Sequence, residues 1–92
     1  MLTLVDQKFP IARKDHHCMA CDFLQESLID VVDMFTFSQK RSVVKARKNC
    51  WEIKRGEKYT RQFLVSGDDC WSFKGITDIH LICLEYELYP EL

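Results

Sequence analysis

The stretch KDHHCMACDF, residues 14–23, places two cysteines in the spacing C-x-x-C directly after two histidines. Thiolate sulfur and imidazole nitrogen are the ligands that zinc prefers in proteins. A C-x-x-C in a tight turn directs two thiolates at one ion, so Cys18 and Cys21 form half of a candidate metal site. A structural zinc site is closed by four protein ligands, so the other half must come from elsewhere in the chain.

The segment HLIC, residues 80–83, supplies a suitable second half. It lies in a stretch with a helical pattern, where residues i and i+3 share one face. The imidazole of His80 and the thiolate of Cys83 can therefore converge on one ion. We predict a single Zn²⁺ held by Cys18, Cys21, His80 and Cys83.

Other interpretations of these residues remain open. His16 or His17 could replace His80, although their adjacency to Cys18 crowds the geometry. A redox dithiol needs a C-x-x-C at a helix N-terminus after a buried strand, and no apolar strand precedes Cys18. A Cys–His hydrolase needs a larger scaffold with an oxyanion pocket. Cys50 and Cys70 have no partner at ligand spacing, so we expect ordinary thiols there.

Length and composition set the class of protein. The chain has 92 residues, 47% of them apolar, which fits one domain over residues 1–92. A core of this size benefits from a structural metal. No apolar run approaches the ~20 residues of a membrane span. The N-terminus has an acid at Asp6 and no basic flank, which argues against a signal peptide, so we expect a cytoplasmic protein with reduced cysteines.

The remaining chain alternates helical and strand patterns. Apolar residues at helical spacing predict a helix over 23–35, capped by Asp22. The capping-box spacing of Thr36 and Gln39 predicts a second helix over 37–48, which would form a helical hairpin with the first. Alternating residues predict a β-hairpin over 58–74, and Thr77 or Asp78 can cap a final helix.

The order of these parts predicts the fold. A zinc knuckle, then a β-hairpin, then a ligating helix is the layout of a treble-clef zinc finger, an α+β architecture. About thirty residues separate knuckle and hairpin, so residues 23–49 are interpreted as a helical pair inserted into the scaffold. Insertions of this kind often carry a partner-binding surface.

Charge is segregated along the chain. Residues 40–61 contain nine basic and two acidic residues, whereas the last 17 residues contain four acids and no base. This polarity favours an acidic partner, either protein or nucleic acid, although a solvated helix face would have the same composition. The candidate partner-binding residues are Lys40, Arg41, Lys45, Arg47, Lys48, Lys54 and Arg55.

Aromatic residues around the predicted hairpin could stack on nucleic-acid bases. In a small domain they more often form the core. A dedicated DNA-binding protein is usually basic overall, whereas this chain has a formal net charge of −1. The residues concerned are Trp51, Tyr59, Phe63, Trp71 and Phe73.

The segments ARKDHHCMAC, IKRGEKYTRQF, WSFKG and HLIC, taken together, resemble small zinc-finger-like proteins encoded by tailed bacteriophages and prophages. The resemblance spans about Ala12 to Cys83 and implies the same four zinc ligands. Small non-enzymatic phage proteins often act on host machinery, including as inhibitors of bacterial defence systems. The resemblance thus implies a host-takeover or anti-CRISPR-like role in the bacterial cytoplasm, through an unidentified host protein.

HNH nucleases share the treble-clef scaffold, so an enzyme is an alternative interpretation. They need two catalytic histidines around a hairpin and usually an orienting asparagine. Once His80 binds zinc, only His16 and His17 remain, and the single asparagine, Asn49, lies in the predicted insertion. We therefore expect a non-enzymatic binding protein, with a DNA- or RNA-binding module as the alternative.

Overall fold

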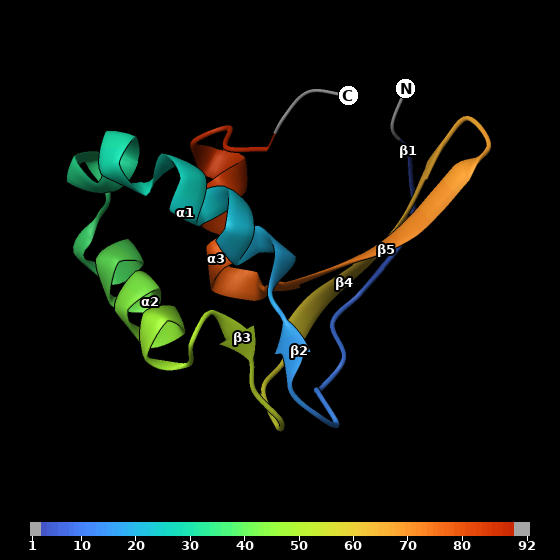
Figure 1. Cartoon of the computed structure of the whole chain (residues 1–92), viewed down its shortest axis with the longest axis horizontal. Coiled ribbons are helices and arrows are strands. Elements are labelled where there is room, and N and C mark those ends of the chain that lie inside the picture. The colour runs from blue at the N-terminus through green and yellow to red at the C-terminus, as the bar shows by residue number, and fades with distance from the viewer. Residues whose placement is uncertain (1–2, 90–92) are drawn as a thin grey trace.

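The computed structural model describes residues 3–89 of the chain. Within that part, three α-helices and two antiparallel sheets make a small α+β domain. The helices gather on one side of the molecule, and the three-stranded sheet extends away from them (Figure 1). The domain is flat, with principal extents of 39 × 31 × 16 Å.

The larger sheet is built on the predicted β-hairpin. Strand β4 (Tyr59–Ser66) pairs antiparallel with β5 (Asp69–Ile76), and Gly67 takes a φ of +60° in the turn between them, which glycine adopts without strain. Strand β1 (Thr3–Lys8) joins the other side of β4, so the strand order is β1-β4-β5. The hairpin over 58–74 is confirmed, whereas the sequence pattern did not predict β1.

The smaller sheet joins two segments that are distant in sequence. Strand β2 (His16–His17) pairs antiparallel with β3 (Glu52–Ile53). The pairing holds the residues directly before Cys18 beside the segment that follows the second helix. Ile53 is fully buried, so this short ladder is anchored in the core.

Helix α1 (Met19–Val31) differs from its prediction at both ends. Cys18, not Asp22, is the N-cap, and its sulfur accepts a hydrogen bond from the backbone N–H of Cys21. The helix ends at Val31 and tightens into a 3₁₀ turn, η1 (Val32–Met34). The C-x-x-C therefore lies at a helix N-terminus rather than in a separate turn before the helix.

Helix α2 (Phe37–Lys48) agrees with its prediction. The Thr36 side chain accepts a hydrogen bond from the Gln39 N–H, and the Gln39 side chain accepts one from the Thr36 N–H. This reciprocal pair is a complete capping box.

Helix α3 (Thr77–Glu85) continues directly from β5. Neither Thr77 nor Asp78 caps it, because its N-cap is Ile76, which contributes no side-chain hydrogen bond. The Thr77 hydroxyl is instead hydrogen-bonded to the buried Thr60 hydroxyl at 3.0 Å. That bond ties the start of α3 to β4.

Helix α3 packs against both of the other helices. Helices α1 and α2 each contact α3 instead of forming the closely packed helical hairpin that we expected. Ala20 and Leu24 of α1 are fully buried, and a Cβ atom at Gly75 of β5 would lie only 3.0 Å from the Ala20 Cβ. Helix α1 is therefore part of the core, and the interpretation of residues 23–49 as a separable insertion does not hold for it.

Candidate functional site

The three buried cysteines gather where α1 begins and α3 makes its second turn. Cys18, Cys21 and Cys83 are each 0% exposed. The Cys18 sulfur accepts backbone hydrogen bonds from Cys21 and from Ile76, both at 3.3 Å. The Cys83 thiol donates to the carbonyl of Ala20 at 3.4 Å, which places it beside the C-x-x-C segment. The structure thus brings together three of the four predicted ligands.

The thiols differ in acidity. A hydrogen bond from the Cys21 thiol lowers the pKa of Cys18 to about 7, and the backbone N–H of Ile76 acts in the same direction. The same Cys18–Cys21 bond, together with burial, raises the pKa of Cys21. Burial raises the pKa of Cys83 to about 11. Cys18 is therefore the most acidic of the three thiols, and thiolate is the form that binds metal.

His80 lies in the same region but is engaged elsewhere. Its side chain is buried, and burial lowers its pKa, which favours the neutral imidazole. Its Nδ1 lies 2.6 Å from the Tyr89 hydroxyl, and its Nε2 lies 3.4 Å from the Gln62 amide nitrogen. The ring also packs against the rings of Phe73 and Tyr89, at centroid distances of 5.2 and 5.5 Å.

The donor atoms of the cluster suit a soft metal ion, but their positions do not surround a common metal position. Three thiols and a neutral imidazole are the donors of a Cys₃His zinc site. Yet across residues 3–89 no group of three or more histidine, cysteine or acidic side chains is arranged around a common metal position. The predicted ligand set therefore remains a prediction, and the Tyr89 hydroxyl lies beside both His80 and Cys83.

The histidines before the C-x-x-C have other contacts. The Nε2 of His17 lies 2.6 Å from a carboxylate oxygen of Asp22, and this hydrogen bond raises the pKa of His17. The ring of His16 lies 5.5 Å from that of Tyr59.

The redox interpretation meets only part of its requirement. The C-x-x-C does stand at a helix N-terminus, which that interpretation needs. However, the strand before it, β2, has two residues that are not buried, and both thiols are closed to solvent. A thiol–disulfide exchange with another molecule needs an accessible sulfur.

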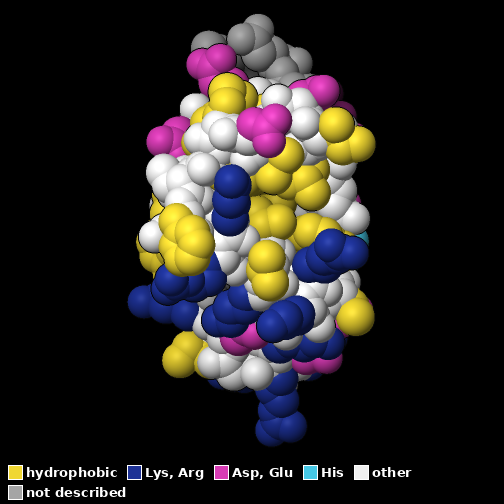
Figure 2. Space-filling model, turned by 90° about the vertical axis from the view of Figure 1, so that its left-hand side faces the viewer, with side chains coloured by type: hydrophobic (Ala, Val, Ile, Leu, Met, Phe, Trp, Pro, Cys, Tyr) yellow, Lys and Arg dark blue, Asp and Glu magenta, His cyan; other side chains and the backbone are white. Residues whose placement is uncertain are grey.

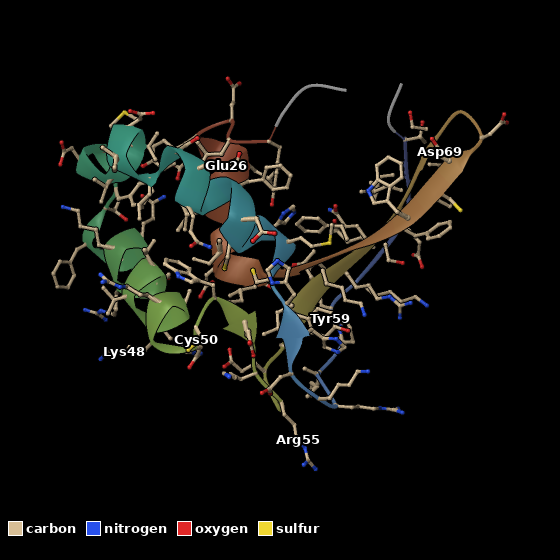
Figure 3. All side chains as sticks on the ribbon, in the orientation of Figure 1. Glu26, Lys48, Cys50, Arg55, Tyr59 and Asp69 are labelled. Atoms are coloured by element: carbon tan, nitrogen blue, oxygen red, sulfur yellow. The ribbon has the colours of Figure 1, made fainter. Side chains whose placement is uncertain are left out.

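Cys50 and Cys70 lie outside the cluster. Both are exposed. Figure 3 shows Cys50 at the end of α2, and Asp69, the neighbour of Cys70, at the tip of the hairpin.

The basic candidates divide into two groups. Lys40, Arg41, Lys45, Arg47 and Lys48 lie on α2, which carries no acidic residue. Among the described residues, none of these five forms a salt bridge. Lys54 is instead paired with Asp15 at 3.5 Å and Glu52 at 3.3 Å, while Arg55 extends outward from the β3–β4 turn (Figure 3).

Apolar side chains lie among the bases of α2. Phe37 is 76% exposed and Val44 is 51% exposed, and the guanidinium of Arg41 lies 5.0 Å from the centre of the Phe37 ring. Figure 2 shows this side of the molecule, with apolar side chains at the centre, basic ones around and below them, and acidic ones toward the top. We call the outward side of α2, from Phe37 to Lys48, the α2 face.

Helix α3 borders the α2 face with charge of the opposite sign. A hollow of about 240 Å³ between the two helices is lined by residues that include Ser38, Leu81 and Glu85. A larger one, of about 480 Å³, lies at the other end of α2 and is lined by residues that include Lys45 and Asp78. Sequence patterning did not predict these hollows, because they depend on how α2 packs against α3.

The aromatic residues considered for base stacking are mostly core. Tyr59 and Phe73 are buried, and Trp51 and Trp71 are partly buried against the core. Phe63 is the member of the set with an exposed side chain, at 40%. A row of stacking aromatics is not present among them.

No helix in residues 3–89 has the length and apolar character needed to cross a membrane. Comparisons with protein-family models, with curated proteins and with solved structures find no match to this chain.

Proposed function

We propose that this chain is a non-enzymatic binding protein that docks a host protein on its α2 face, over a treble-clef-like scaffold held together by one structural zinc ion. The α2 face supports this proposal most directly. It presents five basic side chains, none of which is paired with a carboxylate of residues 3–89, and exposed Phe37 and Val44 lie among them. An apolar centre with a charged rim is the usual composition of a protein–protein interface.

The neighbouring acids favour a protein over a nucleic acid as the partner. Asp78 lines both hollows beside α2, and Glu85 lines the smaller one. Acidic side chains also occupy the top of the same side of the molecule (Figure 2). A phosphate backbone would be repelled by them, whereas a protein surface can match both signs of charge. The partner that fits is an acidic protein surface with an apolar centre.

The sequence resemblance supports the biological setting of the proposal. A phage or prophage accessory protein would act in the cytoplasm of the bacterial host. Its target would be a component of a defence or nucleic-acid-processing complex, which it would block by occupying a surface. No catalytic step is part of this proposal.

Zinc would join α1 to α3 in this account. Cys18 and Cys21 at the start of α1, with Cys83 and His80 on α3, are the residues that would hold it. The ion would link two helices that contact each other, and metal binding of this kind contributes directly to folding.

Charge reversal tests the α2 face. Arg41, Lys45 and Lys48 would be changed together to Glu, and the variant would be compared with a matched reversal of the exposed residues Lys8, Arg13 and Lys14 on the β1–β2 side. Each protein would be used to capture partners from host lysate, with and without nuclease.

We expect the α2 variant to bind the captured protein at least about tenfold more weakly, with an unchanged melting temperature, and the matched variant to bind normally. Equal binding by the two variants would contradict the proposal. Capture that is lost on nuclease treatment and falls by orders of magnitude between low and moderate salt would instead show nucleic-acid binding.

A further inference from the structure

Helix α3 ends in a turn that folds the chain back on the helix. The Leu88 N–H donates to the Cys83 carbonyl at 2.9 Å, and the Glu87 N–H donates to the Leu84 carbonyl at 3.4 Å. Glu87 has a φ of +53°, in the left-handed region. These are the two hydrogen bonds and the backbone conformation of a Schellman motif.

The turn carries Tyr89 back into the thiol–imidazole cluster. Its ring lies edge-on to Phe23 at 5.2 Å and to Phe73 at 5.8 Å, so α1 and β5 hold it from two sides. Its hydroxyl lies 2.6 Å from the Nδ1 of His80.

The position of that hydroxyl bears on the zinc site. The Nε2 of His80 is turned to Gln62, so Nδ1 is the nitrogen on the side of Tyr89 and Cys83. A zinc ion bound to Nδ1 would lie about 2.0–2.1 Å from it. The Tyr89 oxygen already occupies that direction from the ring.

We infer that Tyr89 belongs to this site together with the four proposed ligands. In the metal-free protein its hydroxyl bonds to the His80 nitrogen and shields the thiols, and it must leave that nitrogen when a metal ion binds. This inference rests on the zinc site proposed above. It makes Tyr89 a positioning residue that competes with the ion and lowers the affinity of the site.

Two Tyr→Phe variants test the inference. Tyr89→Phe removes the hydroxyl and keeps the ring. Tyr86→Phe is the matched control, because its hydroxyl bonds to the Met34 carbonyl and the Gln39 side chain, away from the cysteines. Co²⁺ titration of both variants and the unchanged chain, followed by thiolate-to-cobalt absorption, measures the affinity directly.

We expect Tyr89→Phe to bind Co²⁺ about fivefold more tightly, which is the worth of one net hydrogen bond, and Tyr86→Phe to match the unchanged chain. Equal affinity for Tyr89→Phe would overturn the inference while leaving the metal site in place. Weaker binding would also overturn it, since Tyr89 would then assist the metal.

A measurement without metal tests whether the Tyr89 hydroxyl shields the thiols, independently of the zinc proposal; we call this shielding the closing role. In chelator, with Cys50 and Cys70 replaced by Ser, the three buried thiols should react slowly with a thiol reagent. Tyr89→Phe should speed that reaction about fivefold and Tyr86→Phe should not. An unchanged rate would overturn the closing role. Absence of cobalt binding in all three proteins would instead overturn the zinc site and the competition together.

Discussion

The five cysteines of this chain occupy two kinds of environment. Cys18, Cys21 and Cys83 are fully buried and lie close together, whereas Cys50 and Cys70 are exposed and lie at separate edges of the molecule. Sequence spacing was enough to separate the two groups. It could do so because C-x-x-C and a helical i, i+3 pair are local patterns.

This division predicts which cysteines are needed for metal binding. Cys50→Ser and Cys70→Ser should retain the metal, since a hydroxyl at an exposed position disturbs neither packing nor ligation. Cys18→Ser should lose it, because a serine hydroxyl is a poor ligand for zinc. Elemental analysis of the three purified proteins checks this. Retention in Cys18→Ser together with loss in either of the others would show that the ligand set is wrong.

The pair of His17 and Asp22 predicts a pH effect at the start of α1. The hydrogen bond to Asp22 raises the pKa of His17 above its ordinary value of 6.5. The pair therefore stabilises the fold fully below the unfolded-state pKa, and this contribution is lost as the pH rises through the raised value. Both side chains are more than half exposed, so the effect is small.

NMR titration of the His17 ring is the measurement. Asp22→Asn should lower the pKa of His17 and leave that of His16 unchanged. A His17 pKa that does not move would show that the pair is absent in solution.

The residues that sequence analysis missed depend on tertiary structure. Tyr89 reaches His80 only because Glu87 takes a left-handed conformation, and glutamate gives no signal for that conformation. The N-cap was also assigned wrongly, because cysteine is an uncommon cap and Asp22 is a common one. Cys18 caps α1 through its sulfur.

Among the elements, those with strong local signals were predicted well. Helix α2 has its capping box, and the β4–β5 hairpin has alternating side chains and a glycine turn. Strand β1 has no buried residue and a register shift between Leu4 and Asp6, so alternation gave no signal there. Strands β2 and β3 have two residues each, too few to form a pattern.

The end of α3 provides a test of the element that positions Tyr89. A non-glycine residue in the left-handed region costs about 1–2 kcal/mol. Glu87→Gly removes this cost, although glycine also has a larger conformational entropy in the unfolded chain, which offsets part of the gain. We therefore expect the free energy of unfolding to rise by up to about 1 kcal/mol. Glu85→Gly, within the last turn of α3, should lower it by about 1 kcal/mol.

Denaturant unfolding of these two variants gives the comparison. Destabilisation by both glycine substitutions would show that Glu87 is not left-handed in solution, and that the turn carrying Tyr89 is formed differently.

At the scale of the whole molecule, the fold determines which basic residues of the sequence form a charged surface. The basic stretch 40–61 is not uniformly charged, because Lys54 is paired with Asp15 and Glu52, whereas the bases of α2 form no salt bridge with any residue that the structure describes. Sequence composition predicted a basic surface. It could not predict which bases are neutralised, since Asp15 lies far from Lys54 along the chain.

Phe37 should contribute strongly to binding on that surface. Exposed aromatic side chains at the centre of an interface often account for a large share of the affinity. We expect Phe37→Ala to weaken partner binding at least about tenfold without changing the melting temperature, because the side chain is 76% exposed. Val5→Ala, at a site 58% exposed on β1, which pairs with β4, is the control. Equal affinities for the two variants would exclude Phe37 from the interface.

The zinc ion is the claim on which the scaffold depends, and native mass spectrometry tests it most directly. Protein purified without chelator should have the mass of one chain plus one zinc ion. Cys83→Ser should lose that mass and melt at a lower temperature, because metal binding contributes to the stability of the fold. An unchanged chain that is purified folded and at its bare mass would contradict the account.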